Sequence, residues 1–193
     1  KARGLYTYYG HEGIIPKKGD ITLRLFVCID PGSDNRLKLE KYITLQRKHG
    51  ALGSFTRAGN LHLTLAFIGE TDRAQAAAAA LDALDFAPFT LFSGEIGTFS
   101  GGGKDVVWLG VKKCPELEKL AADTAQALRR SGFAIEKRPF VPHLTLGRGV
   151  RNWNASLPPP EFSALANEVV LMESTRVNGV IKYIPLHILM ARD

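Results

Sequence analysis

Two four-residue segments of the chain are identical, and they hold the residues best suited to chemistry. His62-Leu63-Thr64-Leu65 and His143-Leu144-Thr145-Leu146 both read His-Leu-Thr-Leu, although the chain has only five histidines. Successive side chains of a β-strand point to opposite faces, so each segment places its histidine and threonine on one face and its leucines on the other. Each strand would therefore offer a polar pair to a site while its leucines anchor it in a core.

Two such strands lying side by side would bring two imidazoles and two hydroxyls into one groove. Imidazole titrates near neutral pH, so one histidine can accept a proton from a nucleophile while the other, charged, donates one to a leaving group. The hydroxyls of Thr64 and Thr145 can donate hydrogen bonds to non-bridging phosphate oxygens, where charge increases in the transition state. The pattern predicts a phosphate site with His62 and His143 as catalytic residues, and this chemistry requires no metal and no cofactor.

Other roles for these residues stay open on sequence alone. A single histidine on a strand is more often a structural residue of the core or surface, although two matching copies weaken that interpretation. A metal site is less favoured, because each strand supplies one good ligand and Glu70 is the nearest carboxylate in sequence. Cys28 and Cys114 lie outside both segments and have no C-x-x-C spacing, so we expect small buried hydrophobic residues rather than nucleophiles or a disulfide framework.

The elements that must position these residues form a mixed pattern of strands and helices. Apolar runs bounded by turn residues predict strands at 21–29, 61–68, 89–99, 105–111, 141–146, 165–172 and 183–190. Helical spacing predicts helices over 33–49, 73–84 and 115–132, the last with Pro115 in its first turn and Gly132 at its end. Seven or eight strands and three helices that do not strictly alternate favour an α+β fold with a largely antiparallel sheet.

The order of these elements contains an internal repeat. A strand, a long helix and a histidine-bearing strand follow one another in residues 21–68 and again in residues 105–148. We interpret the repeat as two lobes related by a pseudo-two-fold axis, with helices on the outside and a central groove. Residues 21–193 have the length of one bilobal domain. Residues 1–20, with three Tyr and four Gly and no apolar periodicity, predict a flexible leader.

Composition and charge narrow the class of protein. With 45% hydrophobic and 23% charged residues, the chain is neither disordered nor fibrous. Its longest uncharged stretches fall short of the roughly 20 apolar residues of a membrane span, and it lacks a secretory signal, so we expect a cytoplasmic protein. The net charge is +6, and residues 129–151 hold six cations against Glu136 alone. This local excess favours an anionic partner.

The motifs resemble those of a known family. Paired His-x-Thr/Ser-x motifs define the two-histidine phosphoesterase superfamily, and within it the chain is most similar to the bacterial and archaeal RNA 2',3'-cyclic phosphodiesterases, once described as 2'-5' RNA ligases. The likeness covers about residues 22 to 190. It includes the segments RLFVCID (24–30), NLHLTLAFIGE (60–70), VVWLG (106–110) and RPFVPHLTLGR (138–148).

The resemblance implies a bilobal fold and metal-independent hydrolysis of a ribose 2',3'-cyclic phosphate to a 2'-phosphomonoester. By the family's usual assignment, His143 would activate water and His62 would protonate the departing 3'-oxygen, but the sequence does not fix which is which. Thr64 and Thr145 would hold the phosphate.

Two further site residues follow from the resemblance, and alternation along a strand argues against both. Arg148, just past the second motif, would add charge to the phosphate site. Strict alternation points it away from His143, so this role requires the strand to end before Arg148, and a surface arginine is the alternative. Phe67 resembles the family's aromatic residue that stacks on a nucleobase. It falls on the face opposite His62 and Thr64, so a core phenylalanine stays open as an equal alternative.

The functional hypothesis is an enzyme that hydrolyses cyclic phosphate ends of RNA or of small nucleotides. Its partners would be RNAs such as tRNA halves or short oligonucleotides, which Arg57, Lys137 and Arg138 would guide unless they only solvate the surface. The protein would act as a monomer away from membranes. Two alternatives stay open, which are 2'-5' RNA ligation by the reverse reaction and a non-catalytic RNA-binding module.

Overall fold

The computed structural model describes residues 21–101 and 105–192, so the expected leader at 1–20 lies outside the described residues. The strands are β1 (Leu23–Ile29), β2 (Leu52–Phe55), β3 (Leu63–Thr71), β4 (Phe89–Phe99), β5 (Val106–Val111), β6 (His143–Arg151), β7 (Ser163–Ala166), β8 (Glu168–Val177) and β9 (Val180–Met190). The helices are α1 (Ser33–Lys48), α2 (Ala74–Asp82) and α3 (Pro115–Arg130), with a short 3₁₀ turn η1 (Ala58–Asn60).

All strand pairs of the described residues are antiparallel, and the sheet has two halves with the same internal order. The path runs β7-β4-β5-β6-β3-β1-β8-β9, and β2 adds to β6. We call β3-β1-β8-β9 the first lobe and β6-β5-β4-β7 with β2 the second lobe. The lobes meet at β3 and β6 through one residue pair, Leu63 with Leu144. The predicted α+β fold with pseudo-two-fold lobes is confirmed.

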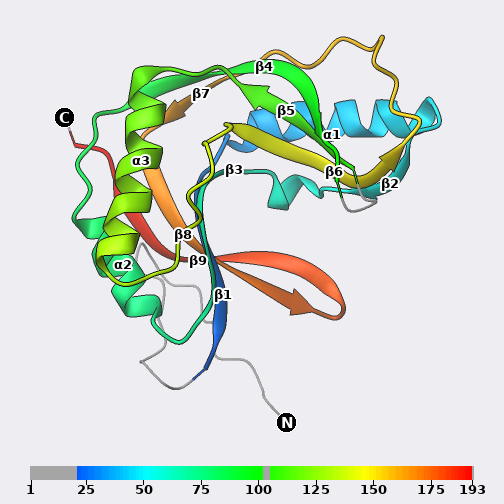
Figure 1. Cartoon of the computed structure of the whole chain (residues 1–193). Helices are drawn as coiled ribbons and strands as arrows, with labels where there is room; N and C mark the ends of the chain where they lie inside the picture. Colours follow the sequence, from blue (N-terminus) through cyan, green and yellow to red (C-terminus); the bar gives the residue numbers. More distant parts are fainter. Residues whose placement is uncertain (1–20, 102–104, 193) are drawn as a thin grey trace.

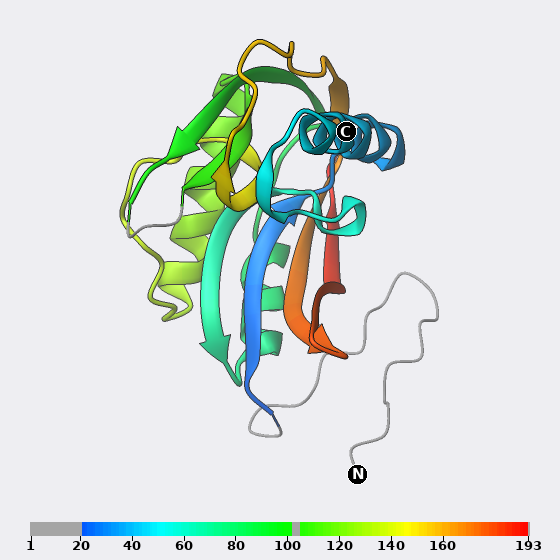
Figure 2. The same cartoon turned by 90° about the vertical axis from the view of Figure 1, so that its right-hand side faces the viewer.

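The long helix of each repeat covers the opposite lobe. Helix α1 follows β1 of the first lobe, yet its Asn35 donates to the carbonyl of Ser163 in β7, and its Arg47 lies over the ring of Phe55 in β2. Helix α3 connects β5 and β6 of the second lobe, yet it packs against β3 and α2. Figures 1 and 2 show α1 on one half of the molecule and the α2–α3 pair on the other. Within the described ranges, no helix has the length and apolar character of a membrane span.

The core lies between the helices and one face of the sheet. The motif leucines Leu63, Leu65, Leu144 and Leu146 are all buried there, as the alternation predicts. Helix α3 buries the five residues that the helical spacing selects, namely Leu117, Leu120, Ala121, Thr124 and Leu128. The histidines and threonines therefore face the other side of the sheet, which we call the groove face.

Two strand predictions differ from the structure. The segment 165–172 is not one strand, because the chain crosses between lobes at Asn167: β7 ends at Ala166 and pairs with β4, whereas β8 begins at Glu168 and pairs with β1. Strand β2 was not predicted, since its sequence Leu-Gly-Ser-Phe is mostly exposed and has no apolar alternation. It forms because the backbone of β6 offers it a hydrogen-bonding edge.

Candidate active site

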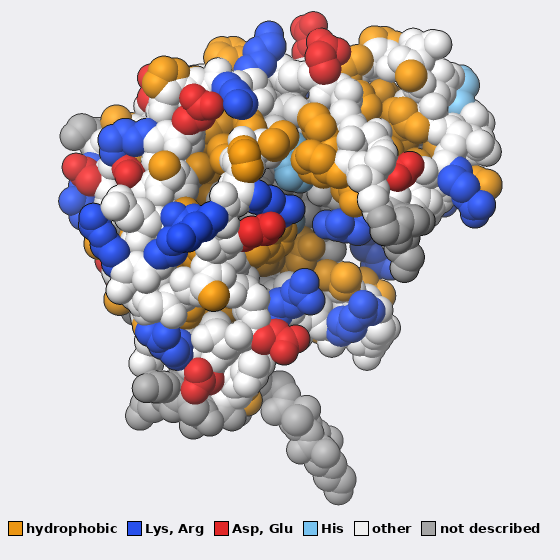
Figure 3. Space-filling view, in the orientation of Figure 1, with side chains coloured by type: hydrophobic (Ala, Val, Ile, Leu, Met, Phe, Trp, Pro, Cys, Tyr) orange, Lys and Arg blue, Asp and Glu red, His pale blue; other side chains and the backbone are white. Residues whose placement is uncertain are grey.

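The two histidine motifs meet at the junction of the lobes. His62 directly precedes Leu63 and His143 directly precedes Leu144, and these leucines are the pair that joins β3 to β6. Both imidazoles and both threonine side chains are half-buried on the groove face. Figure 3 shows a hollow in this region, where a histidine is visible among hydrophobic side chains and Lys or Arg side chains. The structure therefore brings His62, Thr64, His143 and Thr145 together.

Each imidazole is fixed by the same hydrogen bond. Nδ1 of His62 lies 2.8 Å from the carbonyl oxygen of Asn60, and Nδ1 of His143 lies 2.7 Å from that of Val141. A carbonyl oxygen only accepts, so both Nδ1 atoms carry the proton and donate it. This leaves Nε2 of each ring as the atom that can exchange a proton with a substrate, either as a base or, when charged, as an acid.

The backbone that supplies these carbonyls is itself anchored to neighbouring strands. The side-chain amide of Asn60 donates to the carbonyl of Ile181 in β9 over 3.0 Å. In the second lobe the backbone N–H of Val111 in β5 donates to the carbonyl of Pro142 over 3.0 Å. These bonds hold the residues before each histidine, and so limit how far the imidazoles can turn.

Burial lowers the pKa of both histidines. The pKa of His62 is lowered to about 4, chiefly by burial and also by the charge of His143, while the hydrogen bond to Asn60 acts in the opposite direction. Burial also lowers the pKa of His143, with further lowering by the guanidinium groups of Arg138 and Arg148. Both imidazoles therefore favour the neutral form in the free protein, and a bound anion would shift each of them toward the charged form.

Aromatic rings flank each histidine on the groove face. The imidazole of His62 lies 4.7 Å from the ring of Phe26 in β1 and 5.1 Å from that of Tyr183 in β9, measured between centroids. The imidazole of His143 lies 4.9 Å from the ring of Phe99 in β4 and 5.8 Å from that of Trp108 in β5. These rings supply the burial that lowers the histidine pKa values, and they give the groove apolar walls.

A one-residue β-bulge follows the threonine of each motif, and it corrects the alternation argument. In β3 the partner of Cys28 is Thr64 but the partner of Val27 is Ala66, so Leu65 is the extra residue. The bulge moves Phe67 onto the groove face, where it pairs with Phe26 and stays 52% exposed. The alternative of a core phenylalanine is therefore wrong, because the side chain is exposed.

The same bulge occurs at the equivalent place in β6. Trp108 pairs with Thr145 but Val107 pairs with Gly147, which makes Leu146 the extra residue and brings Arg148 onto the groove face. The guanidinium of Arg148 lowers the pKa values of both His143 and Tyr183, which belong to different lobes. Arg148 therefore faces the groove and not the outer surface that alternation predicts. Its positive charge acts on the residues of both groove walls.

The chain matches a known superfamily. The model of the 2'-5' RNA ligase superfamily matches residues 39–178 of the chain. This chain belongs to the 2'-5' RNA ligase superfamily. The resemblance that the paired motifs indicate is thus confirmed.

Relatives within the superfamily cover most of the chain. The RNA 2',3'-cyclic phosphodiesterase of Escherichia coli (strain K12) is 35% identical over 170 residues, which span 84% of this chain and 93% of that protein. A protein of the same name from Archaeoglobus fulgidus is 35% identical over 130 residues, 65% of this chain and 72% of its own length. The crystal structure of Escherichia coli LigT complexed with 3'-AMP has a TM-score of 0.75 at 28% identity, covering 90% of this chain and 100% of that one.

The three cations that the sequence suggests as RNA guides, Arg57, Lys137 and Arg138, are all exposed on the surface. Arg138 pairs with Glu136 at 3.2 Å and its charge contributes to the lowered pKa of His143. Arg57 directly precedes η1, and its carbonyl accepts a hydrogen bond from the backbone N–H of Asn60.

The burial of Cys28 disfavours cysteine chemistry at the site. Cys28 is fully buried beside Thr64, and burial raises the pKa of its thiol, which disfavours a thiolate nucleophile. Cys114 is half-buried at the start of α3. Among the residues that the structure describes, no cluster of three His, Cys, Asp or Glu side chains is arranged to hold a metal ion.

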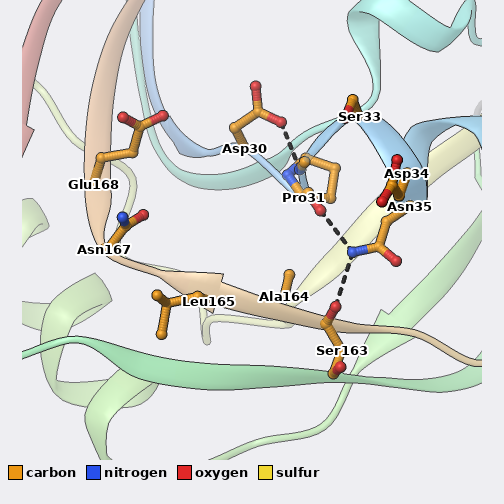
Figure 4. Close-up of a pocket in the computed structure, with 11 residues that line it drawn as sticks. Asp30, Pro31, Ser33, Asp34, Asn35, Ser163, Ala164, Leu165, Asn167 and Glu168 are labelled. Carbon is orange, nitrogen blue, oxygen red and sulfur yellow. Dashed lines mark hydrogen bonds between the residues drawn. The ribbon is translucent and has the colours of Figure 1, made fainter.

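A separate polar depression of about 440 Å³ lies at the N-terminal end of α1, and Figure 4 shows its lining. Asp30 accepts a hydrogen bond from the backbone N–H of Gly32 and pairs with Arg36, and Asn35 donates to the carbonyls of Pro31 and Ser163. Asp34 and Glu168 add carboxylates to its wall. An acidic lining disfavours phosphate, so the anion-binding chemistry belongs to the histidine groove.

Several groove residues were not predicted from the sequence as part of the site. Alternation in β1 places Arg24 and Phe26 on the same face of the sheet as Cys28 and its partner Thr64. The sequence of β1 therefore contained a signal for these two groove residues. Trp108 lies in a segment that resembles the family, but nothing in that segment indicates contact with His143. Phe99 and Tyr183 come from strand ends far from either motif, and only the sheet order brings them to the histidines.

Proposed function

We propose that this chain is a metal-independent RNA 2',3'-cyclic phosphodiesterase, which hydrolyses the cyclic phosphate at an RNA end or on a small nucleotide to a 2'-phosphomonoester. The observation that carries this proposal is the paired presentation of His62 and His143, each with Nδ1–H bound to a carbonyl and Nε2 left for the substrate. Two such imidazoles supply both proton transfers of the reaction. The names of the relatives from Escherichia coli and Archaeoglobus fulgidus support the same activity.

The reaction needs one neutral and one charged imidazole. Nε2 of His143 takes a proton from water as the water oxygen forms a bond to phosphorus. The bond between phosphorus and the 3'-oxygen breaks, and the charged Nε2–H of His62 gives its proton to that oxygen. The phosphate stays on the 2'-oxygen, and proton exchange with solvent restores both rings.

The phosphate is held by groups on both lobes. The hydroxyls of Thr64 and Thr145 donate hydrogen bonds to its non-bridging oxygens, where charge grows in the transition state. The guanidinium of Arg148 adds a fixed positive charge and two parallel donors. The same phosphate anion stabilises the imidazolium of His62, which offsets the effect of burial on its pKa.

The nucleoside that carries the cyclic phosphate lies against the first lobe. Phe67 is exposed there, with its ring 6.2 Å from that of Phe26, so one of its faces is open to a nucleobase. Stacking at Phe67 keeps the ribose on the side of His62, which is why His62 is the acid that protonates the 3'-oxygen. RNA ends such as tRNA halves or short oligonucleotides fit this site, since only the terminal nucleotide enters it.

The test is turnover of an oligonucleotide ending in a 2',3'-cyclic phosphate, in excess chelator, with the product identified by mass spectrometry and ³¹P NMR. The product is a 2'-phosphate, and His62→Ala or His143→Ala each lowers kcat by about 10²- to 10⁴-fold, as removal of a general acid or base does. The matched control is His49→Ala, which removes an exposed histidine at the end of α1 and leaves activity unchanged. RNA binding without conversion would favour the non-catalytic module, and unfolding of both groove variants would favour structural histidines.

A second substrate separates the acid from the base. When sulfur replaces the 3'-oxygen of the cyclic phosphate, the leaving thiolate needs little help from an acid. His62→Ala should then recover most of its lost rate, whereas His143→Ala should stay slow. Recovery of the His143 variant instead would reverse the two roles.

A further inference from the structure

The proposed hydrolysis leaves one exposed aromatic side chain of the groove without a substrate group to bind. Phe99, at the end of β4, is 39% exposed, and the edge-to-face contact of its ring with His143 places it in the second lobe. Water is the nucleophile on that side of the phosphate, and water requires no aromatic surface. Phe99 is therefore a binding surface beside the base that the proposed reaction does not use.

Phe99 rests on an indole ring that the surrounding strands are shaped to hold. The ring centroids of Phe99 and Trp108 lie 5.0 Å apart at a tilt of 35°. A Cβ on Gly97 of β4 would overlap the indole of Trp108, and a Cβ on Gly110 of β5 would lie 3.3 Å from it. Glycines at both positions let the indole lie flat against the backbone, so Phe99 has a rigid support.

The direction of the reaction says what this surface faces. In an in-line displacement at phosphorus, the nucleophile and the leaving oxygen lie on opposite sides of the phosphorus atom. With the cyclic nucleotide at Phe67 and its 3'-oxygen at His62, the nucleophile approaches from His143. An alcohol in place of that water would carry its own substituent toward Phe99.

We propose that Phe99, supported by Trp108, is a second nucleobase platform for the nucleoside whose 5'-oxygen occupies the water position. This inference rests on the proposed function and its roles for the two histidines. The ligand class is a nucleoside or RNA with a free 5'-hydroxyl, and the corresponding substrate is a 2'-5'-linked phosphodiester. In the forward direction the 5'-oxygen bonds to phosphorus and gives its proton to His143, while the P–O3' bond breaks and the 3'-oxygen takes a proton from His62. In reverse, the 3'-hydroxyl attacks phosphorus and the 5'-oxygen leaves with a proton.

The experiment compares three substrates on the full chain. They are 2',3'-cyclic AMP, the same nucleotide extended by one adenosine on its 5' side, and the 2'-5'-linked adenosine dinucleotide. Phe99→Ala should lower kcat/KM for the 2'-5' dinucleotide by about tenfold or more, the size expected for loss of one stacked base. Hydrolysis of the first two substrates should change by a smaller factor that is the same for both, because loss of the ring also alters the burial of His143. Phe99→Tyr should keep the wild-type profile. The control Phe92→Ala removes another phenylalanine of β4, 51% exposed, and should affect none of the three.

Each other result overturns the inference. An equal loss of kcat/KM on all three substrates means that Phe99 only positions His143. A loss confined to the extended nucleotide means that Phe99 binds the upstream base. No loss on any substrate means that Phe99 binds no part of them. If wild-type protein leaves 2',3'-cyclic AMP intact, the proposed function fails, and calorimetry with adenosine then decides the platform separately. Weaker adenosine binding by Phe99→Ala supports the platform, and equal binding refutes it.

Discussion

Each groove histidine stands in surroundings that oppose its charged form. Aromatic rings exclude water from His62 and His143, and cationic neighbours act against their protonation. Yet acid catalysis needs a proton on one of them. The monoanionic phosphodiester of a substrate supplies the missing counter-charge, so the charged imidazole is stabilised when the groove is occupied. Binding and protonation are coupled in such a site.

The pH dependence of kcat/KM tests this coupling, because it reports the free protein. The productive form has one neutral and one charged imidazole, which exists between the two apparent pKa values of the pair. His62 has a pKa of about 4 and that of His143 lies below 6.5, so kcat/KM should peak between these values and fall at higher pH. The profile of kcat, measured with substrate bound, should lie at higher pH. A kcat/KM maximum above about pH 7 would contradict the assignment.

Unfolding at low pH must be separated from this effect. The folded pKa of His62 lies below its ordinary value of 6.5, so the unfolded chain binds the proton more tightly. The free energy of unfolding therefore declines as the pH falls from 6.5 toward 4. Circular dichroism at each pH shows whether the protein is still folded where kcat/KM is measured.

At the scale of the elements, the sequence predicts the histidine strands well but misplaces the residues that follow them. Strict alternation puts His62 with Thr64 and His143 with Thr145, which is correct because no bulge lies between them. Alternation then fails for Phe67 and Arg148, since a bulge adds one residue to β3 and to β6. The extra residues, Leu65 and Leu146, are apolar and buried, as a regular strand without a bulge would also have them. No pattern in the sequence therefore reveals the bulge.

Long-range pairing explains the other misses. The helices are predicted from local spacing, as the buried residues of α3 confirm. Strand β2 forms because it pairs with the edge of β6. The break at Asn167 arises because β7 before it and β8 after it join different lobes. Neither feature has a signal in the residues of the segment itself. For the same reason the aromatic walls of the groove could not be assigned before the sheet order was known.

Packing between β4 and β5 gives a prediction at this scale. Gly97→Ala should displace the indole of Trp108, because the new Cβ overlaps the ring. Overpacking of this kind lowers the free energy of unfolding by about 1–3 kcal/mol. Chemical denaturation measures that loss, and a changed tryptophan fluorescence spectrum reports the displaced ring. Gly101→Ala is the control, since a Cβ there meets no atom within 4 Å, and equal behaviour of the two variants would argue against a tightly held indole.

At the scale of the whole molecule, the lobes are equivalent in strand order but different at one functional position. Phe67 and Arg148 each lie five residues past a motif histidine and directly after its bulge. One offers an aromatic surface and the other a positive charge. This difference, more than the histidines themselves, gives the groove a direction along which a nucleotide can bind.

The exchange of helices between lobes predicts one cooperative unfolding transition. Unfolding of the first lobe alone would expose the faces of α2 and α3 that pack near β3, and Leu144 of β6 would lose its partner Leu63. Helix α1 would also lose its connection to a folded β1. Native-state hydrogen exchange should therefore give the same opening free energy for the amides of β1 and of β5. A lower value for either strand would show that one lobe opens alone.

The position of β1 in the sheet also bears on how the chain reaches this state. Its residue Leu25 pairs with Glu173 in β8, nearly the whole length of the described chain away. Such pairings close large loops before they gain contacts, and proteins dominated by them fold in milliseconds to seconds. During synthesis on the ribosome, one edge of β1 therefore has no partner until β8 has emerged, and in that interval the nascent chain exposes an apolar strand that a chaperone could bind.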